Sequence, residues 1–137
     1  SVWEAVELLG AERIGHGIRA SEDPALLRML RRRHVPLEVC PTSNVCLGVA
    51  PSLSEHALPR LIAEGLYVTI NSDDPPMFNT TLTDEYLRAA QILGCGAETV
   101  EQLAVNAVRA SLLPESSRVE MERQFREEFA RLRMDGE

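Results

Sequence analysis

Residues 66–75 have the sequence LYVTINSDDP, in which a run of strand-forming side chains passes directly into polar ones. Aromatic and β-branched residues favour a buried strand, and they follow one another in this run. We therefore predict a strand over residues 66–71. Its carboxyl end then delivers two carboxylates, Asp73 and Asp74, to one edge of a sheet.

The same layout occurs twice upstream. Residues 12–15 form a short strand candidate, which is followed by His16 between two glycines. In residues 35–40 apolar side chains alternate with others, as in a strand, and residues 41–44 continue as Pro-Thr-Ser-Asn. Successive strand candidates thus end in residues that carry reactive groups.

Helical patterns separate these strands. Asp23 before Pro24 is typical of a helix start. Strands that alternate with helices indicate an α/β fold with a parallel sheet, in which ligand sites lie at the carboxyl ends of the strands. The predicted helices cover residues 2–9, 24–33 and 58–64, and further ones open at Thr81, Thr99 and Ser117, whereas residues 41–51 are predicted to be a loop.

The composition fits one globular domain, because the chain has 137 residues of which 45% are hydrophobic and 26% are charged. A net charge of -7 argues against nucleic acid or an anionic membrane as the main partner. No apolar run has the length needed to span a bilayer. The 3 cysteines are an odd number without dense spacing, which argues against a secreted disulfide framework, so we expect a cytoplasmic protein.

The polar residues at the predicted strand ends suggest an active site. Imidazole exchanges a proton near neutral pH, so His16 suits acid–base work, although a hydrogen-bonded turn histidine is the alternative. Neighbouring side chains of an extended chain diverge. Asp73 and Asp74 therefore fit two separate roles, such as a ligand of a metal like zinc and a contact to substrate, and the alternative is a solvated turn.

The remaining cysteines and histidines do not form a metal-binding motif. Cys40 and Cys46 are too far apart for a usual zinc knuckle, and we interpret both as small apolar packing residues. Cys95 is expected to lie in a loop. We expect His34 to be exposed and His56 to have a capping or surface role.

Three motifs occur in the order and spacing of the adenosine deaminase family, namely residues 13–17 (RIGHG), 40–44 (CPTSN) and 71–78 (NSDDPPMF). The helix around residues 103–113 is also similar to the family's C-terminal region. The chain therefore resembles this family over nearly its whole length. The resemblance implies a zinc-bearing (β/α)8 barrel that deaminates a 6-aminopurine by hydrolysis, in which zinc lowers the pKa of a bound water to about 7.

The resemblance also implies roles for individual residues. His16 matches the catalytic histidine that orients the zinc-bound water and assists its deprotonation. Asp73 matches the catalytic aspartate that binds the metal and contacts the water. Asp74 matches the substrate-binding aspartate that hydrogen-bonds the purine ring at N7.

The chain departs from the family pattern in one respect. The His-x-His pair and the His-Ala-Gly-Glu motif, which supply the other zinc ligands and a catalytic glutamate, do not occur in its sequence. We therefore expect residues 1–137 to be the C-terminal portion of a single barrel domain, with strands six to eight and the helices after them. The N-terminal half, from the same or a separate chain, would be a required partner, because a closed barrel needs eight strands.

The resemblance leaves several candidate substrates. Adenosine is the first expectation, and adenine and 6-aminodeoxyfutalosine are the alternatives. A barrel enzyme for another amine or amide, or a catalytically inactive binding module of the same fold, is also considered. The presence of His16, Asp73 and Asp74 together argues against the inactive module.

Overall fold

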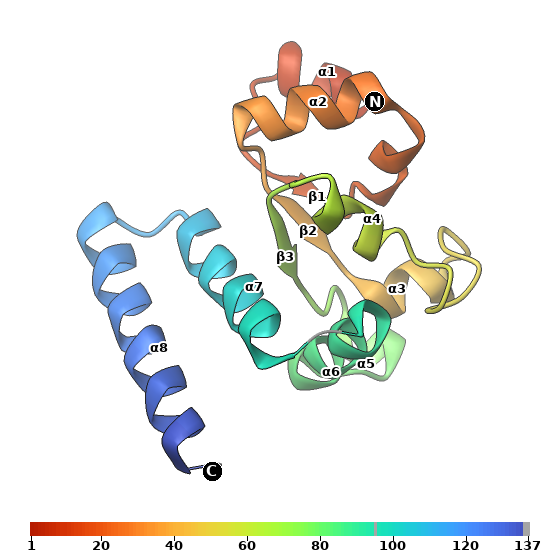
Figure 1. The fold of residues 1–137 in the computed structure, drawn as a ribbon. Helices are drawn as coiled ribbons and strands as arrows, with labels where there is room; N and C mark the ends of the chain where they lie inside the picture. The colour runs from red at the N-terminus through yellow and green to blue at the C-terminus, as the bar shows by residue number, and fades with distance from the viewer. Residues whose placement is uncertain (95, 136–137) are drawn as a thin grey trace.

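The centre of the fold is a parallel sheet with the strand order β1-β2-β3 (Figure 1). Its strands are β1 (Ile14–Gly15), β2 (Leu37–Val39) and β3 (Val68–Ile70), each shorter than the range predicted from the sequence. The coordinates are a computed structural model that describes residues 1–94 and 96–135. The predicted α/β class with a parallel sheet is confirmed.

β2 is the central strand, and β3 is the most deeply buried one. Leu37 pairs with Ile14 on one side and with Val68 on the other, and Val39 pairs with Ile70. The side chains of Leu37 and Val39 are fully buried. Leu37 and Val39 lie on one face of β2, whereas the half-buried Glu38 between them lies on the other face and forms an ion pair with Arg13, so the burial of β2 alternates.

Helical segments connect the strands. Between β1 and β2 lie the short 3-10 helix η1 (Ile18–Glu22) and α2 (Pro24–Arg33), and between β2 and β3 lie α3 (Pro41–Cys46) and α4 (Leu58–Ala63). Figure 1 shows β2 and β3 running toward α3, α5 and α6, with α7 beside β3. The other helices are α1 (Val2–Glu7), α5 (Pro75–Phe78), α6 (Leu82–Leu93), α7 (Ala97–Ala110) and α8 (Glu115–Asp135).

Three short helices occupy positions that the sequence did not lead us to expect. The predicted loop over residues 41–51 is wrong in its first part, which forms α3, and η1 and α5 were not predicted at all. A proline stands at the start of α3 and of α5, where a missing N–H is tolerated. Asp74 caps α5, because its Oδ1 accepts a hydrogen bond from the N–H of Met77 at 3.0 Å.

The starts of the last helices confirm one prediction and correct two. Thr81 caps α6 in a capping box with Asp84, as predicted. α7 begins at Ala97 after an extended Gly96, so Thr99 lies inside its first turn and is not its cap. α8 begins at Glu115, directly after a proline, so Ser117 does not open it.

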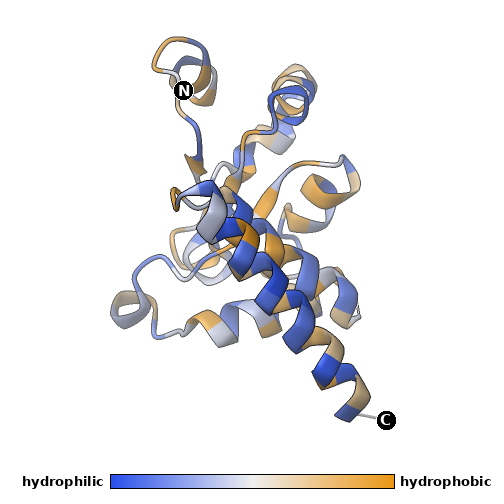
Figure 2. Ribbon diagram, turned by 90° about the vertical axis from the view of Figure 1, so that its left-hand side faces the viewer, coloured by the Kyte–Doolittle hydropathy of each residue, from blue (hydrophilic) through white to orange (hydrophobic). Residues whose placement is uncertain are grey.

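α8 is held mainly by charged side chains. None of its side chains is buried, and the predicted apolar stripe is half-buried or exposed in the structure. Hydrophilic residues predominate along it (Figure 2). Arg109 forms a two-pronged ion pair with Glu122 that ties α7 to α8, and pairs within α8, such as Arg123 with Glu127, add to its stability. No helix in the described residues is long and apolar enough to cross a membrane.

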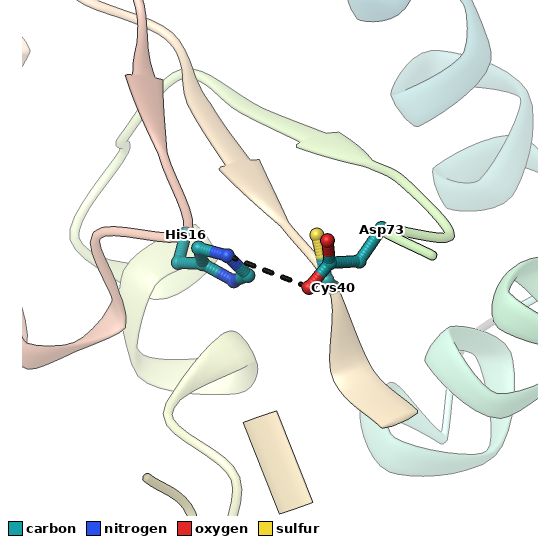
Figure 3. A group of neighbouring side chains, drawn as sticks. All are labelled: His16, Cys40 and Asp73. Atoms are coloured by element: carbon teal, nitrogen blue, oxygen red, sulfur yellow. Dashed lines mark ion pairs between the residues drawn. The ribbon is translucent and has the colours of Figure 1, made fainter. Parts of the chain in front are cut away.

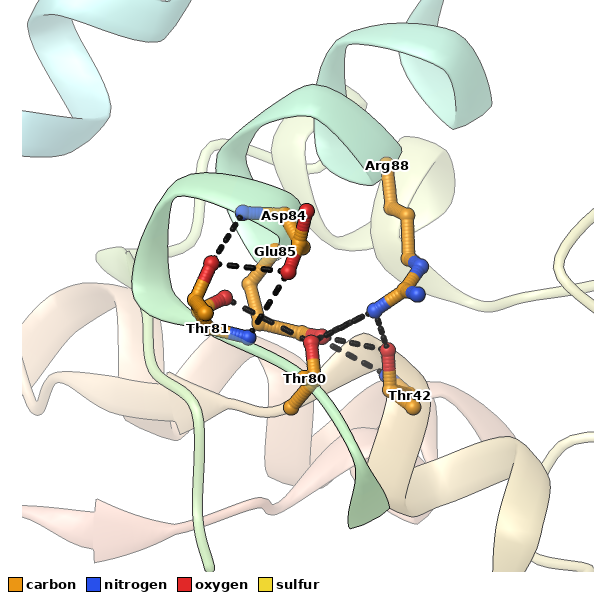
Figure 4. A network of polar contacts seen from close by, with 6 residues as sticks. All are labelled: Thr42, Thr80, Thr81, Asp84, Glu85 and Arg88. Atoms are coloured by element: carbon orange, nitrogen blue, oxygen red, sulfur yellow. Dashed lines mark hydrogen bonds and ion pairs between the residues drawn. The ribbon is translucent and has the colours of Figure 1, made fainter. Parts of the chain in front are cut away.

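A buried carboxylate joins α3 to α6. Glu85 is fully buried and accepts hydrogen bonds from the N–H and hydroxyl of Thr42, from the hydroxyl of Thr80 at 2.5 Å and from Arg88 at 2.8 Å (Figure 4). The first residue of α3 has no side-chain cap before it. Glu85 therefore supplies from another helix the acceptor that the start of α3 needs.

Replacing this carboxylate should destabilise the fold strongly. Glu85→Ala leaves the N–H of Thr42 without its acceptor and Arg88 without its counter-charge, and breaking a buried ion pair from one side costs about 3 kcal/mol or more. Asp84→Ala is the matched control, because Asp84 belongs to an exposed helix cap whose loss should cost much less. Urea denaturation measures both losses, and equal losses would contradict the role of Glu85.

Candidate functional site

The carboxyl ends of the three strands bring together the side chains of His16, Cys40 and Asp73 (Figure 3). Each follows a different strand, and their nitrogen, sulfur and oxygen atoms lie within 4.8 Å of one another. They line a cleft of about 530 Å³ that also includes Asn71 and Tyr86. The structure therefore brings His16 and Asp73 together at the strand ends, and their roles as site residues stay a prediction.

His16 and Asp73 face each other from left-handed turns. His16 Nε2 lies 3.6 Å from an Asp73 carboxylate oxygen, and both side chains are part-exposed to the cleft. The backbone φ angles are 59° at His16 and 57° at Asp73. Non-glycine residues adopt such angles at a cost of about 1–2 kcal/mol, and strain of this kind clusters at functional sites.

The short helix α3 contacts both of these residues. The Ser43 hydroxyl donates a hydrogen bond to Asp73 Oδ2 at 2.6 Å. The side-chain amide of Asn44 lies 3.1 Å from His16 Nδ1. Ser43 and Asn44 are buried, and the polar residues that follow the second strand in the sequence were the signal that could have identified these contacts.

Asp74 serves a different partner from its neighbour. Its carboxylate caps α5 through Met77, whereas Asp73 accepts from Ser43. The two adjacent carboxylates therefore diverge. Among the described residues that line the cleft, Asp73 is present and Asp74 is not.

Cys40 is buried, as expected of a packing residue. Burial, aided by the negative charge of Asp73, raises the pKa of its thiol to about 12. The same interpretation is wrong for Cys46, which is exposed at the last residue of α3. Cys95, predicted to lie in a loop, is outside the described residues.

The other two histidines have different environments. His34 is exposed at the end of α2, as predicted. His56 is buried, so a surface role is wrong, and its capping role is confirmed because its Nδ1 accepts a hydrogen bond from the N–H of Leu58 at 3.0 Å. Burial lowers the pKa of His56.

The donor set at the strand ends fits part of a zinc site. Zinc in proteins is bound by carboxylate oxygen, imidazole nitrogen and thiolate sulfur, and catalytic sites use three protein ligands and a water. Asp73 offers a carboxylate oxygen and His16 an imidazole nitrogen at one place. Cys40 adds a sulfur atom to the same group, and it would bind an ion only as the thiolate. Asp73, which the resemblance implies as a metal ligand, is the candidate of this chain for holding the ion.

Comparison with known proteins identifies the family. The family model described as adenosine deaminase matches residues 1–127. The chain belongs to the adenosine deaminase family. The resemblance predicted from the three sequence motifs is confirmed.

Relatives of this deaminase-family chain include proteins with two different names. A Streptomyces coelicolor protein named aminodeoxyfutalosine deaminase is 50% identical over 113 residues, which are 82% of this chain and 29% of that protein. A Chelativorans protein named adenine deaminase is 42% identical over 133 residues, which are 97% of this chain and 39% of that protein. The chain therefore spans about a third of the length of these relatives.

A solved structure shows the same fold. The crystal structure of an adenine deaminase from Arthrobacter aurescens matches with a TM-score of 0.90 and 35% identity. The match covers 94% of this chain and 39% of that one. The parallel strands and helices of this chain thus correspond to a part of a larger deaminase.

The two described cysteines should differ greatly in reactivity. With a pKa of about 12, only about one Cys40 thiol in 10,000 is ionised at pH 8. Iodoacetamide should therefore label the exposed Cys46 at least about 100-fold faster than Cys40. Peptide mass spectrometry measures both rates, labelling in urea is the control, and similar rates in the native protein would show that Cys40 is not held as a buried thiol.

Proposed function

We propose that this chain forms part of an aminohydrolase that removes the 6-amino group of an aminopurine. Water adds its oxygen at C6, and the products are the 6-oxopurine and ammonia. The observation that carries this proposal is the convergence of His16 and Asp73 at the carboxyl ends of parallel strands. Membership of the adenosine deaminase family supports the same reaction.

The chain contributes one metal ligand and one orienting group in this proposal. Zinc, when bound, supplies a water whose pKa is lowered to about 7. The Asp73 carboxylate helps to hold the ion, and Ser43 fixes one of its oxygens. His16 Nε2 faces the same place and orients the attacking water by hydrogen bonding.

Asp74 is proposed to contact the purine ring at N7. The support is the family motif, in which the two aspartates follow the same strand. Its carboxylate is fixed against the start of α5 by Met77. This hydrogen bond gives the Asp74 carboxylate a defined position, separate from that of Asp73.

The substrate is proposed to be adenine, 6-aminodeoxyfutalosine or adenosine. The relatives' names support the first two, and adenosine stays our expectation from the motifs. The rate of ammonia release, measured with each of the three compounds, identifies the preferred substrate. An inactive binding module is less well supported, because His16 and Asp73 keep a geometry that such a module would not need.

The remaining strands of the barrel are proposed to come from residues outside this chain. The described residues form three parallel strands, whereas a closed barrel has eight. The same outside residues would supply the other zinc ligands. A location in the cytoplasm also remains a proposal, based on the number and spacing of the cysteines.

Substitutions in the whole enzyme should separate the two roles. Asp73→Ala should lower both zinc content and turnover, because it removes a ligand. His16→Ala should lower turnover by about 100-fold or more, the scale of acid–base groups, and leave zinc largely in place. Metal analysis and ammonia release measure these effects. Asp135→Ala, at the exposed end of α8, is the control, and unchanged turnover in either site variant would refute its assigned role.

The 137-residue chain by itself should be inactive. One carboxylate and one imidazole do not make up the three protein ligands of a catalytic zinc site. We expect no ammonia release from the isolated chain and recovery of activity when the rest of the barrel is added. Turnover by the isolated chain would contradict the proposed division of ligands.

A further inference from the structure

A chain of hydrogen bonds leads from His16 into the interior of the protein. Asn44 and His56 are 1% and 5% exposed. Neither of them lines the cleft at the strand ends. Asn44 Nδ2 lies 3.1 Å from His16 Nδ1, and Asn44 Oδ1 lies 3.1 Å from His56 Nε2. His56 Nδ1 in turn lies 3.0 Å from the backbone nitrogen of Leu58. These contacts from Leu58 through His56 and Asn44 are called the His56–Asn44 relay below.

The direction of the relay is fixed at its inner end. A backbone N–H can only donate, so the N–H of Leu58 requires His56 Nδ1 to be an unprotonated acceptor. His56 is therefore neutral and carries its proton on Nε2. The lowered pKa of this buried histidine agrees with that state.

The state of His56 determines the orientation of the Asn44 amide, which in turn determines the tautomer of His16. The N–H at His56 Nε2 donates to Asn44 and must meet the carbonyl oxygen of its amide. The amide nitrogen of Asn44 then faces His16 and donates to its Nδ1. A neutral His16 whose Nδ1 accepts must carry its proton on Nε2, the atom that faces Asp73.

We propose that Asn44 and His56 are positioning residues that hold His16 in the tautomer with its proton on Nε2. In that tautomer His16 directs its Nε2 N–H toward the Asp73 carboxylate, so it orients the attacking water as a donor and does not take the water's proton at this atom, in contrast to the deprotonation that the resemblance implies. The opposite tautomer would direct a lone pair at the Asp73 carboxylate, 3.6 Å away. The importance of this control for catalysis rests on the proposed function, whereas the tautomer itself does not.

The tautomer can be measured directly in the whole enzyme. Nitrogen-15 NMR of labelled histidine distinguishes a protonated ring nitrogen from an unprotonated one, and the signals lost in His16→Gln and His56→Gln identify the two rings. We expect a proton on Nε2 of both histidines. A proton on Nδ1 of His16 in the unmodified protein would overturn the proposal without any variant of the relay.

Asn44→Asp should invert the tautomer of His16. Aspartate has almost the same shape as asparagine but only acceptor oxygens, so it can still accept from His56 and now also requires a proton on His16 Nδ1. Asn79→Asp is the matched control, because Asn79 is exposed at the end of α5 and the change adds the same charge. Persistence of the original tautomer in a folded Asn44→Asp protein would overturn the proposal.

His56→Asn breaks the relay at a residue that does not touch His16. The shorter amide side chain of this variant can still accept from the N–H of Leu58 but cannot reach Asn44, so the start of α4 keeps its cap. The Asn44 amide is then free to offer either group, and we expect both tautomers of His16. A purely structural role predicts instead that this variant, with its cap kept, leaves the His16 signals unchanged.

Substitutions in the relay should lower kcat. Partners that orient a metal-site histidine are typically worth about 10–100-fold, and we expect a fall of this size in ammonia release for Asn44→Asp and His56→Asn with KM little changed. A changed tautomer with unchanged kcat would overturn the catalytic importance of the relay. Absence of deaminase activity in the unmodified enzyme, with the expected tautomers, would refute the proposed function and leave the relay intact.

Discussion

The geometry of the site depends on the contact between the buried carboxylate of Glu85 and the start of α3. This carboxylate reaches from α6 to the first turn of α3, where the chain offers no side-chain cap of its own. α3 is short, and a helix of this length is not stable by itself. Because Ser43 and Asn44 extend from α3 to Asp73 and His16, the position of two strand-end residues is set by a charge buried outside the cleft.

The parallel sheet and α3 make different contributions to the geometry of the site. The sheet brings the carboxyl ends of three strands to one edge, which places His16 and Asp73 near each other. It does not determine which way an imidazole or a carboxylate turns. The orientation of these side chains comes from buried polar contacts, which are strong when every partner is satisfied. No buried side-chain polar atom among the described residues lacks a hydrogen-bond partner.

The strands and the chemistry of their ends could be predicted because both depend on local sequence. Alternating apolar residues and capping pairs act over a few positions, and the three motifs fixed the family. The short helices could not be predicted in the same way, since α3 takes its cap from Glu85, 43 residues away from Thr42. The burial of His56 likewise depends on the partner Asn44, 12 residues away.

The left-handed turns at His16 and Asp73 set a limit on how far this protein can be stabilised by design. Glycine would relax the backbone at both positions by about 1 kcal/mol or more each, so a consensus or computational search for stability would select these positions early. Both changes would delete the groups that define the cleft. This conflict between stability and activity is common at strained sites, and engineering effort is better directed to the exposed face of α8, where no side chain is buried.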